Sequence, residues 1–355
     1  MPANSPELFR TLDASANRCR EGLRVLEDLV RFQWNDARFS REVKELRHAA
    51  ATVLRELGSD SWIQWRNTPG DVGTQITTTL EASRATIGDL ISANSKRVQE
   101  ALRSLSEFSK LINPVAAATL EQLRYRAYTL EQQMVRLSQS FARIGDRRLY
   151  LLLTESLCRL SWEEVARQAL AGGVDIIQLR EKSLNDAELL RRARLLRELT
   201  RDAGALLIIN DRIDIALLSD ADGVHLGQED LPLPDARKLG GDLLIGVSTH
   251  SIDQLRTSVE DGAGYVGLGP TFPTSTKTFD QFAGLAYLRA ASTETALPSF
   301  AIGGITQNNM AQVVETGVNR IAVSGVICSA DSPLEVAQEL AIELRRAADA
   351  VDSTA

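Results

Sequence analysis

Charged and polar side chains follow directly after an apolar run that begins at Val174. The run Val174-Asp175-Ile176-Ile177 comes after a small-residue turn, and Gln178, Arg180 and Lys182 follow it. A buried strand that ends in convergent polar groups is typical of parallel α/β folds, where a catalytic mouth lies at the carboxyl ends of the strands. We therefore expect Gln178, Arg180 and Lys182 to line such a mouth.

Two aspartates close later apolar runs in the same way. Asp211 follows Asn210 after one run, and Asp230 ends the segment GVHLGQED that begins at residue 223. Carboxylate oxygens are the ligands that Mg²⁺ prefers, with phosphate oxygens and water completing its octahedron. The pattern predicts that Asp211 and Asp230 bind magnesium, although each taken singly also fits a local cap, of a helix or of a turn.

Cations are expected at the same mouth. Arg180 and Lys182 follow the second apolar run, and Lys277 ends the hydroxyl-rich loop GPTFPTSTK at 269–277. Three cations beside a magnesium site would hold a diphosphate, because charge-assisted hydrogen bonds to phosphate are strong.

Glycines follow the last two apolar runs, as Gly303-Gly304 and Ser324-Gly325. Glycine allows a phosphate to approach backbone NH groups closely, and barrels often bind phosphate after strands seven and eight. A diphosphate site and a monophosphate site at one mouth indicate a transferase that joins two phosphorylated molecules.

Two histidines and a serine also lie near strand ends. His225 alternates with apolar neighbours, which favours a hydrogen-bonded interior residue over a ligand, whereas Ser248 and His250 close the fifth run.

Eight short apolar runs alternate with amphipathic segments over residues 146–355. They begin near residues 149, 175, 205, 223, 243, 265, 299 and 320. Eight strand-plus-helix units of this length predict a (β/α)8 TIM barrel, and a doubly wound parallel sheet is the alternative. The number of runs and the polar residues that close most of them favour the barrel.

The first 145 residues have a different pattern. Segments such as LRHAAATVLREL and TLEQLRYRAYTLEQQMVRL space apolar residues by three and four, which predicts an all-α domain with its boundary near Ile144-Gly145-Asp146. Segments 17–26 and 94–105 resemble each other weakly, so they are either a duplicated helical hairpin or two unrelated helices. The Gly-rich stretch 65–74 could cradle phosphate or be a plain interhelical loop.

Composition excludes several classes of protein. The 355 residues are 44% hydrophobic and 25% charged, which fits a soluble chain of two domains. A net charge of -7 argues against nucleic acid as a partner. Because no apolar segment approaches the ~20 residues that span a bilayer and no signal pattern is present, we expect no membrane partner and a cytoplasmic location. The three cysteines have no CxxC spacing, so they predict neither disulfides nor zinc. The oligomeric state, including a homo-oligomer, stays open.

The motifs of the barrel half resemble those of thiamine-phosphate synthases. The matching segments are QLREK at 178–182, ND at 210–211, ADGVHLGQED at 221–230, IGVSTH at 245–250, YVGLGPTFPTSTK at 265–277 and AIGGIT at 301–306. The resemblance implies that hydroxymethylpyrimidine diphosphate is joined to a plain or carboxylated thiazole phosphate, with Mg²⁺ as cofactor and diphosphate released. The partners would then be small phosphorylated pyrimidines and thiazoles.

The resemblance also implies a role for each site residue. Gln178 should contact the pyrimidine, Ser248 should lie by the reacting carbon, and Asp211 and Asp230 should bind magnesium. The diphosphate should be held by Arg180, Lys182, Asn210 and Lys277, and the thiazole phosphate by Thr274, Thr276, Gly304, Ser324 and Gly325. Catalysis would rest on Arg180, Lys182, Ser248 and Lys277. A thiazole tautomerase or a ligand-binding regulator on the same barrel would keep the monophosphate site without needing the full diphosphate site.

The helical half also has a resemblance, carried by the segment NRCREGLRVLED from residue 17 and by RNTPGDVG from residue 66. These segments resemble the helical domain that precedes some thiamine-phosphate synthases and is assigned as a hydroxymethylpyrimidine-phosphate kinase. The resemblance implies phosphate or metal binding by Glu21, Arg24, Arg66, Asp71 and Gly73. A structural or dimerisation domain is the alternative.

Overall fold

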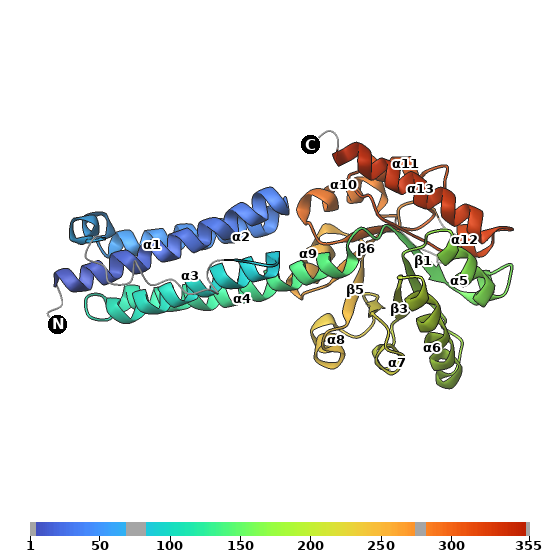
Figure 1. Ribbon diagram of the computed structural model, residues 1–355, viewed down its shortest axis with the longest axis horizontal. Helices are drawn as coiled ribbons and strands as arrows, with labels where there is room; N and C mark the ends of the chain where they lie inside the picture. Colours follow the sequence, from blue (N-terminus) through green and yellow to red (C-terminus); the bar gives the residue numbers. More distant parts are fainter. Residues whose placement is uncertain (1–4, 69–82, 274–281, 353–355) are drawn as a thin grey trace. The chain divides into compact units, whose positions relative to one another are not determined.

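The computed structural model describes residues 5–68, 83–273 and 282–352 (Figure 1). The chain divides into two compact units, Met1–Gln139 and Ser140–Ala355. This division lies within helix α4 and comes a few residues before the domain boundary that was expected from the sequence.

The first unit is helical throughout its described part. Its elements are α1 (Pro6–Asp28), the π-helical turn η1 (Leu29–Gln33), α2 (Ala37–Glu56), the 3₁₀ segment η2 (Ser59–Trp65), α3 (Ile87–Ser109) and α4 (Pro114–Ile144). Local signals explain where these helices begin. The side chain of Ser5 accepts a hydrogen bond from the backbone of Leu8, and Thr86 and Asp89 form a reciprocal capping box.

Helices α1 and α3 pack closely together, and the two similar segments of the sequence lie on them. A Cβ atom at Gly22 would lie 2.8 Å from Val98 Cγ2 and 3.0 Å from the carbonyl oxygen of Asn94. Gly22 is therefore required by the close approach of these two helices.

The second unit is a closed barrel of eight parallel strands in the described part of the chain, in the order β1 to β8 (Figure 1). The strands are β1 (Leu149–Leu153), β2 (Ile176–Leu179), β3 (Leu206–Asn210), β4 (Gly223–Leu226), β5 (Leu244–Thr249), β6 (Tyr265–Leu268), β7 (Ser299–Ile302) and β8 (Ile321–Val323). The closed barrel confirms the predicted TIM fold and excludes the doubly wound sheet. Each of the eight apolar runs expected from the sequence forms one strand.

Helices follow the strands and surround the barrel (Figure 1). They are α5 (Trp162–Ala171), α6 (Asp186–Asp202), α7 (Ile213–Leu218), α8 (Leu233–Gly240), α9 (Ile252–Glu260), α10 (Gly284–Glu294), α11 (Met310–Val314), α12 (Gly325–Cys328) and α13 (Pro333–Asp352), with a 3₁₀ turn η4 (Glu155–Leu157) after β1.

The barrel interior is filled by side chains that recur at every second residue of the strands. Its core cluster contains Ile144, Tyr150, Ile176, Ile208, Leu244, Tyr265, Phe300 and Ala322. Since successive side chains of a strand point to opposite faces, the residue two positions further on also points inward. Gln178 follows Ile176 and Asn210 follows Ile208 in this way, so the layer above the core carries polar groups.

Candidate active site

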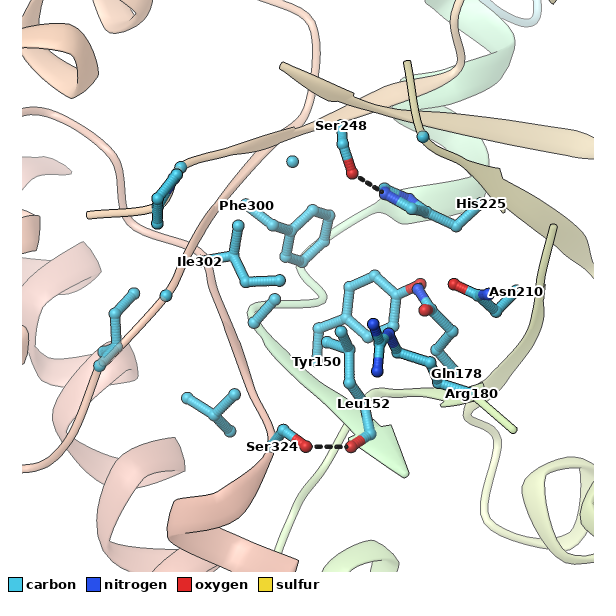
Figure 2. Close-up of a pocket in the computed structure, with 18 of the residues that line it drawn as sticks. Tyr150, Leu152, Gln178, Arg180, Asn210, His225, Ser248, Phe300, Ile302 and Ser324 are labelled. Atoms are coloured by element: carbon cyan, nitrogen blue, oxygen red, sulfur yellow. Dashed lines mark hydrogen bonds between the residues drawn. The ribbon is translucent and has the colours of Figure 1, made fainter. Parts of the chain in front are cut away.

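A cavity of about 860 Å³ opens at the carboxyl ends of the strands. Each strand supplies a lining side chain, and these are Tyr150, Gln178, Asn210, His225, Ser248, Tyr265, Phe300 and Ala322. Figure 2 labels six of them, namely Tyr150, Gln178, Asn210, His225, Ser248 and Phe300. Most of the residues singled out in the sequence lie around it, namely Gln178, Arg180, Lys182, Asn210, Asp211, Asp230, Ser248, Gly304, Ser324 and Gly325. Thr274, Thr276 and Lys277 lie outside the described residues.

Three aromatic rings form the floor of the cavity. The ring centroids of Tyr150 and Tyr265 are 6.0 Å apart, and Phe300 packs edge-on against both at 5.3 and 5.7 Å. Edge-to-face packing of this kind holds rings in fixed positions. Burial raises the pKa of both tyrosines, so their hydroxyls stay protonated and available for hydrogen bonds.

A chain of hydrogen bonds crosses this floor. Gln178 Nε2 donates to Tyr150 Oη at 2.8 Å, and Tyr150 Oη lies 3.0 Å from Tyr265 Oη. Tyr265 Oη lies 3.1 Å from His225 Nδ1. His225 Nε2 lies 2.9 Å from Ser248 Oγ (Figure 2). The other amide atom, Gln178 Oε1, is buried at the cavity and has no hydrogen-bond partner in the described part of the chain.

His225 is held as a neutral imidazole in this chain. Burial lowers its pKa to about 4, and Arg180 contributes to the decrease, whereas the charge of Asp230 opposes it. The interior, hydrogen-bonded histidine expected from the sequence agrees with these contacts.

Two aspartates lie at one side of the mouth. Burial raises the pKa of Asp211, and the neighbouring carboxylate of Asp230 raises it further, although Lys182 Nζ lies 3.6 Å from Asp211 Oδ2. The backbone of Asp211 has a φ of +60°, and Asp230 Oδ2 accepts a 2.7 Å hydrogen bond from the backbone of Gly227. The helix cap considered for Asp211 does not form, because α7 has Arg212 as its N-cap and no side-chain cap bond.

This pair fits a divalent cation. A divalent cation between two neighbouring carboxylates offsets the repulsion of their charges. Groups of three or more His, Cys, Asp or Glu suited to a metal are absent from the described residues. The remaining ligands would therefore have to be phosphate oxygens and water, as Mg²⁺ sites commonly use.

The cationic side of the mouth follows β2. Gln178, Arg180 and Asn210 all line the cavity, and Gln178 is bonded to Tyr150 (Figure 2). The backbone of Arg180 is fixed at both ends, because its NH donates to the carbonyl of Leu153 at 2.9 Å and its carbonyl accepts from Thr154 Oγ1 at 3.0 Å. The charged group of Lys182 is more exposed, with 65% of its side chain open to solvent.

The glycines after β7 are required by their backbone geometry. Gly303 has a φ of +100° and Gly304 a φ of +64°, and a Cβ on Gly304 would lie 2.4 Å from the carbonyl oxygen of Pro273. These conformations keep the backbone at the cavity wall free of side chains. Ser324 Oγ donates to the carbonyl oxygen of Leu152 at 2.8 Å, so this hydroxyl is engaged with the barrel backbone (Figure 2).

The three rings of the aromatic floor are not among the site residues expected from the sequence. Tyr150 and Tyr265 lie inside the apolar runs LYLLL and YVGLG, where an aromatic residue looks like ordinary core. The one available signal was the alternation of the strand, which places each of them two residues below a position that lines the cavity.

Of the phosphate candidates that lie in the described part of the helical unit, Arg66 is separated from Arg24. Arg66 makes a bidentate ion pair with Asp13 at 2.7 and 2.8 Å, whereas Arg24 lies 3.5 Å from Glu27. Asp13 and Arg24 are separated along α1 by roughly 16 Å at 1.5 Å per residue. Glu21 is exposed on the same helix, and Asp71 and Gly73 lie outside the described residues.

Glu27 is a buried carboxylate that contacts three arginines. Its side chain is 3% exposed and lies 2.8 Å from Arg47, 3.5 Å from Arg24 and 3.7 Å from Arg31. Arg24 therefore has a structural partner, which its position in the sequence motif did not predict.

Comparison with known families agrees with both halves of this description. Residues 149–327 match the model of the family described as thiamine monophosphate synthase, and residues 10–133 match that of the ThiD2 family. Among solved structures, the barrel is similar to a thiamine phosphate pyrophosphorylase from Pyrococcus furiosus, with 35% identity and a TM-score of 0.53. That match covers 57% of this chain and 96% of the other.

Relatives named thiamine-phosphate synthase match nearly the whole chain. The protein from Rhodopirellula baltica is 41% identical over 339 residues, which cover 93% of this chain and 90% of the relative. The one from Nostoc punctiforme is 41% identical over 96% of this chain and 95% of its own length. The chain therefore belongs to the thiamine-phosphate synthase family, whose members are transferases.

Proposed function

We propose that the barrel joins 4-amino-2-methyl-5-(diphosphomethyl)pyrimidine to a thiazole phosphate or its carboxylated form, giving thiamine phosphate and diphosphate, with carbon dioxide also released from the carboxylated form. The observation that carries the proposal is the arrangement of one cavity. An unpartnered buried acceptor lies at its floor, cations and paired carboxylates lie at one side, and side-chain-free backbone lies at another.

The pyrimidine would bind at the floor. Gln178 Oε1 is a buried acceptor without a partner, and an exocyclic amine is a donor that satisfies it. The rings of Tyr150, Tyr265 and Phe300 provide the apolar surface on which a flat heterocycle can lie.

The diphosphate would lie against Arg180, Lys182 and Asn210, with Lys277 as a fourth proposed contact. Asp211 and Asp230 would hold magnesium beside it. A bound magnesium ion supplies counter-charge to the diphosphate oxygens as they gain electron density. The thiazole phosphate would accept hydrogen bonds from the backbone of Gly304 and Gly325, with Thr274, Thr276 and Ser324 as the remaining proposed contacts.

The reaction breaks one bond before it forms another. The C–O bond between the methylene carbon and diphosphate breaks, and its electron pair leaves with the diphosphate. The amino group of the pyrimidine stabilises the resulting cation, which the thiazole nitrogen then attacks to form the C–N bond. Arg180 and Lys182 would stabilise the leaving group, and Ser248 would lie by the reacting carbon. The thiazole nitrogen attacks with its lone pair and has no proton to lose, so the coupling requires no general base.

For the helical unit we propose a hydroxymethylpyrimidine-phosphate kinase, which would make the substrate of the barrel. The match of residues 10–133 to the ThiD2 family supports this proposal. The ion pairs of Arg66 and Arg24 give each a structural partner, so a purely structural or dimerisation role remains the second candidate.

One experiment separates these readings. The purified chain is given hydroxymethylpyrimidine monophosphate, thiazole phosphate, Mg²⁺ and ATP, and a parallel reaction receives the pyrimidine diphosphate without ATP. Thiamine phosphate in both reactions would support a kinase and a synthase on one chain. Product from the diphosphate alone would leave a structural role for the helical unit. Product in neither would reject the synthase proposal and favour a thiazole tautomerase or a regulator, for which magnesium dependence is not expected.

A further inference from the structure

Five polar side chains from five strands connect the floor of the cavity to Ser248. They are Gln178 on β2, Tyr150 on β1, Tyr265 on β6, His225 on β4 and Ser248 on β5, and every link is between 2.8 and 3.1 Å. Each hydroxyl has one proton and each amide nitrogen can only donate, so the direction of one hydrogen bond constrains the next.

The direction begins at Gln178. Its Nε2 donates to Tyr150, so the single proton of Tyr150 is directed to Tyr265, the next oxygen in the chain. Tyr265 then donates to Nδ1 of His225. A neutral imidazole that accepts at Nδ1 carries its proton on Nε2, and this nitrogen donates to Ser248 Oγ. Ser248 therefore keeps its own proton for the cavity.

The opposite direction needs only a rotated amide. If Oε1 of Gln178 faced Tyr150, every bond would reverse, and Ser248 would donate to His225 and present only lone pairs to a ligand. A ligand that offers a donor at Gln178 selects the first arrangement, because it pairs with Oε1. The free protein has Nε2 toward Tyr150 and Oε1 at the cavity, which is the first arrangement.

We propose that Tyr265 and His225 are positioning residues that transmit the orientation of the Gln178 amide to Ser248, so that Ser248 is a hydrogen-bond donor at the reacting centre, and that an amino group bound at Gln178 retains this direction. The donated hydrogen bond would stabilise the departing diphosphate oxygen without transferring a proton. This role of Ser248 rests on the proposed synthase reaction, whereas the direction of the chain does not.

The direction of the hydrogen bonds between Gln178 and Ser248 can be measured without an activity assay. The chain has three histidines, so ¹⁵N-labelled histidine gives few signals, and a His225→Gln variant identifies those of His225. We expect an unprotonated Nδ1 and a protonated Nε2 in the free protein, retained when 4-amino-5-hydroxymethyl-2-methylpyrimidine phosphate is added. Tyr265→Phe should produce a mixture of both tautomers. A protonated Nδ1 in the wild type, or an unchanged tautomer in Tyr265→Phe, would overturn the proposal.

A double-mutant cycle tests the link to turnover. Tyr265→Phe should lower kcat about tenfold, the scale of one hydrogen bond, with little change in KM for the thiazole phosphate. In a Ser248→Ala background the same substitution should cause no further loss, because Tyr265 acts only through Ser248. If the losses of kcat in Tyr265→Phe and Ser248→Ala were additive in the double variant, Tyr265 would act by packing and the proposed transmission to Ser248 would be rejected.

The control is Tyr287→Phe, which removes another buried hydroxyl. This hydroxyl donates to Thr249 Oγ1 at 2.7 Å and takes no part in the hydrogen bonds between Gln178 and Ser248. It should leave kcat and the His225 tautomer unchanged. Absence of synthase turnover in the wild type would reject the proposed function. The tautomer measurement would then decide by itself the direction of the hydrogen bonds between Gln178 and Ser248.

Discussion

Gly246→Ala is expected to disrupt the cavity floor through a single methyl group. Gly246 pairs with Tyr265 across β5 and β6, and a Cβ there would lie 2.1 Å from Tyr265 Cζ, where ordinary contacts are 3.4–4 Å. The ring would have to retreat by about 1.3 Å to restore a normal contact. Its hydroxyl makes the 3.0 and 3.1 Å links to Tyr150 and His225, and such a movement would stretch them beyond hydrogen-bonding range.

The magnitude follows from these contacts. Overpacking costs about 1–3 kcal/mol, and the two lost hydrogen bonds add about 1 kcal/mol each. Replacing glycine by alanine restricts the unfolded chain and returns about 0.4–1 kcal/mol. We therefore expect the free energy of unfolding of the barrel to fall by about 2–5 kcal/mol and turnover to fall at least tenfold.

Urea denaturation of the full chain and steady-state turnover measure both effects. The matched control is Gly267→Ala, whose Cβ would lie 3.5 Å from His225 Cε1, an ordinary contact, so its stability should stay within about 1 kcal/mol of the wild type. If Gly246→Ala were as stable as Gly267→Ala and retained the His225 tautomer, the reasoning from the Tyr265 contact would be refuted.

Asp211→Asn keeps the shape of the side chain and suits the φ of +60°, so without magnesium it should be as stable as the wild type or more stable, while turnover falls about 10²-fold. Magnesium at 100 times its Kd should raise the stability of the wild type by about 2.7 kcal/mol in thermal unfolding and leave the variant unchanged, and equal stabilisation of both would contradict the assigned site. Glu27→Gln should destabilise the helical unit by about 2–3 kcal/mol in urea, because three arginines lose their shared counter-charge, whereas Glu107→Gln, at an exposed ion pair, should change stability by less than about 1 kcal/mol. His225 has a folded pKa of about 4, so the unfolded chain binds a proton that the fold does not, and stability should fall as the pH is lowered from about 6.5 to about 4 by at most about 3 kcal/mol. In denaturation experiments at several pH values, His225→Gln should remove this pH dependence of stability. His48→Gln, at an exposed histidine, should retain it. The reverse result would show that a group other than His225 causes the pH dependence.

Much of the barrel could be predicted from the sequence because its signals are local. Each strand is a short apolar run closed by polar residues, and a parallel barrel brings all strand ends to one mouth. Gln178, Asn210 and Asp211 could therefore be assigned to a common site without knowing any contact between them. The helical unit was predictable as a class for the same reason, since spacings of three and four are read within one segment.

The contacts that couple these residues depend on closure of the barrel. Tyr150 and Tyr265 are 115 residues apart, and their hydroxyls meet only because strand register and packing against Phe300 place both rings in one layer. The ion-pair partner of an arginine likewise cannot be predicted from sequence spacing, because Arg66 pairs with Asp13, which is 53 residues away.

The sequence by itself determined the fold, the position of the mouth and the kinds of groups around it, because periodicity and residue type are properties of short segments. Only the tertiary structure decided which hydroxyl, imidazole and amide atoms meet, because a hydrogen bond requires atoms from distant strands to lie within about 3 Å of each other.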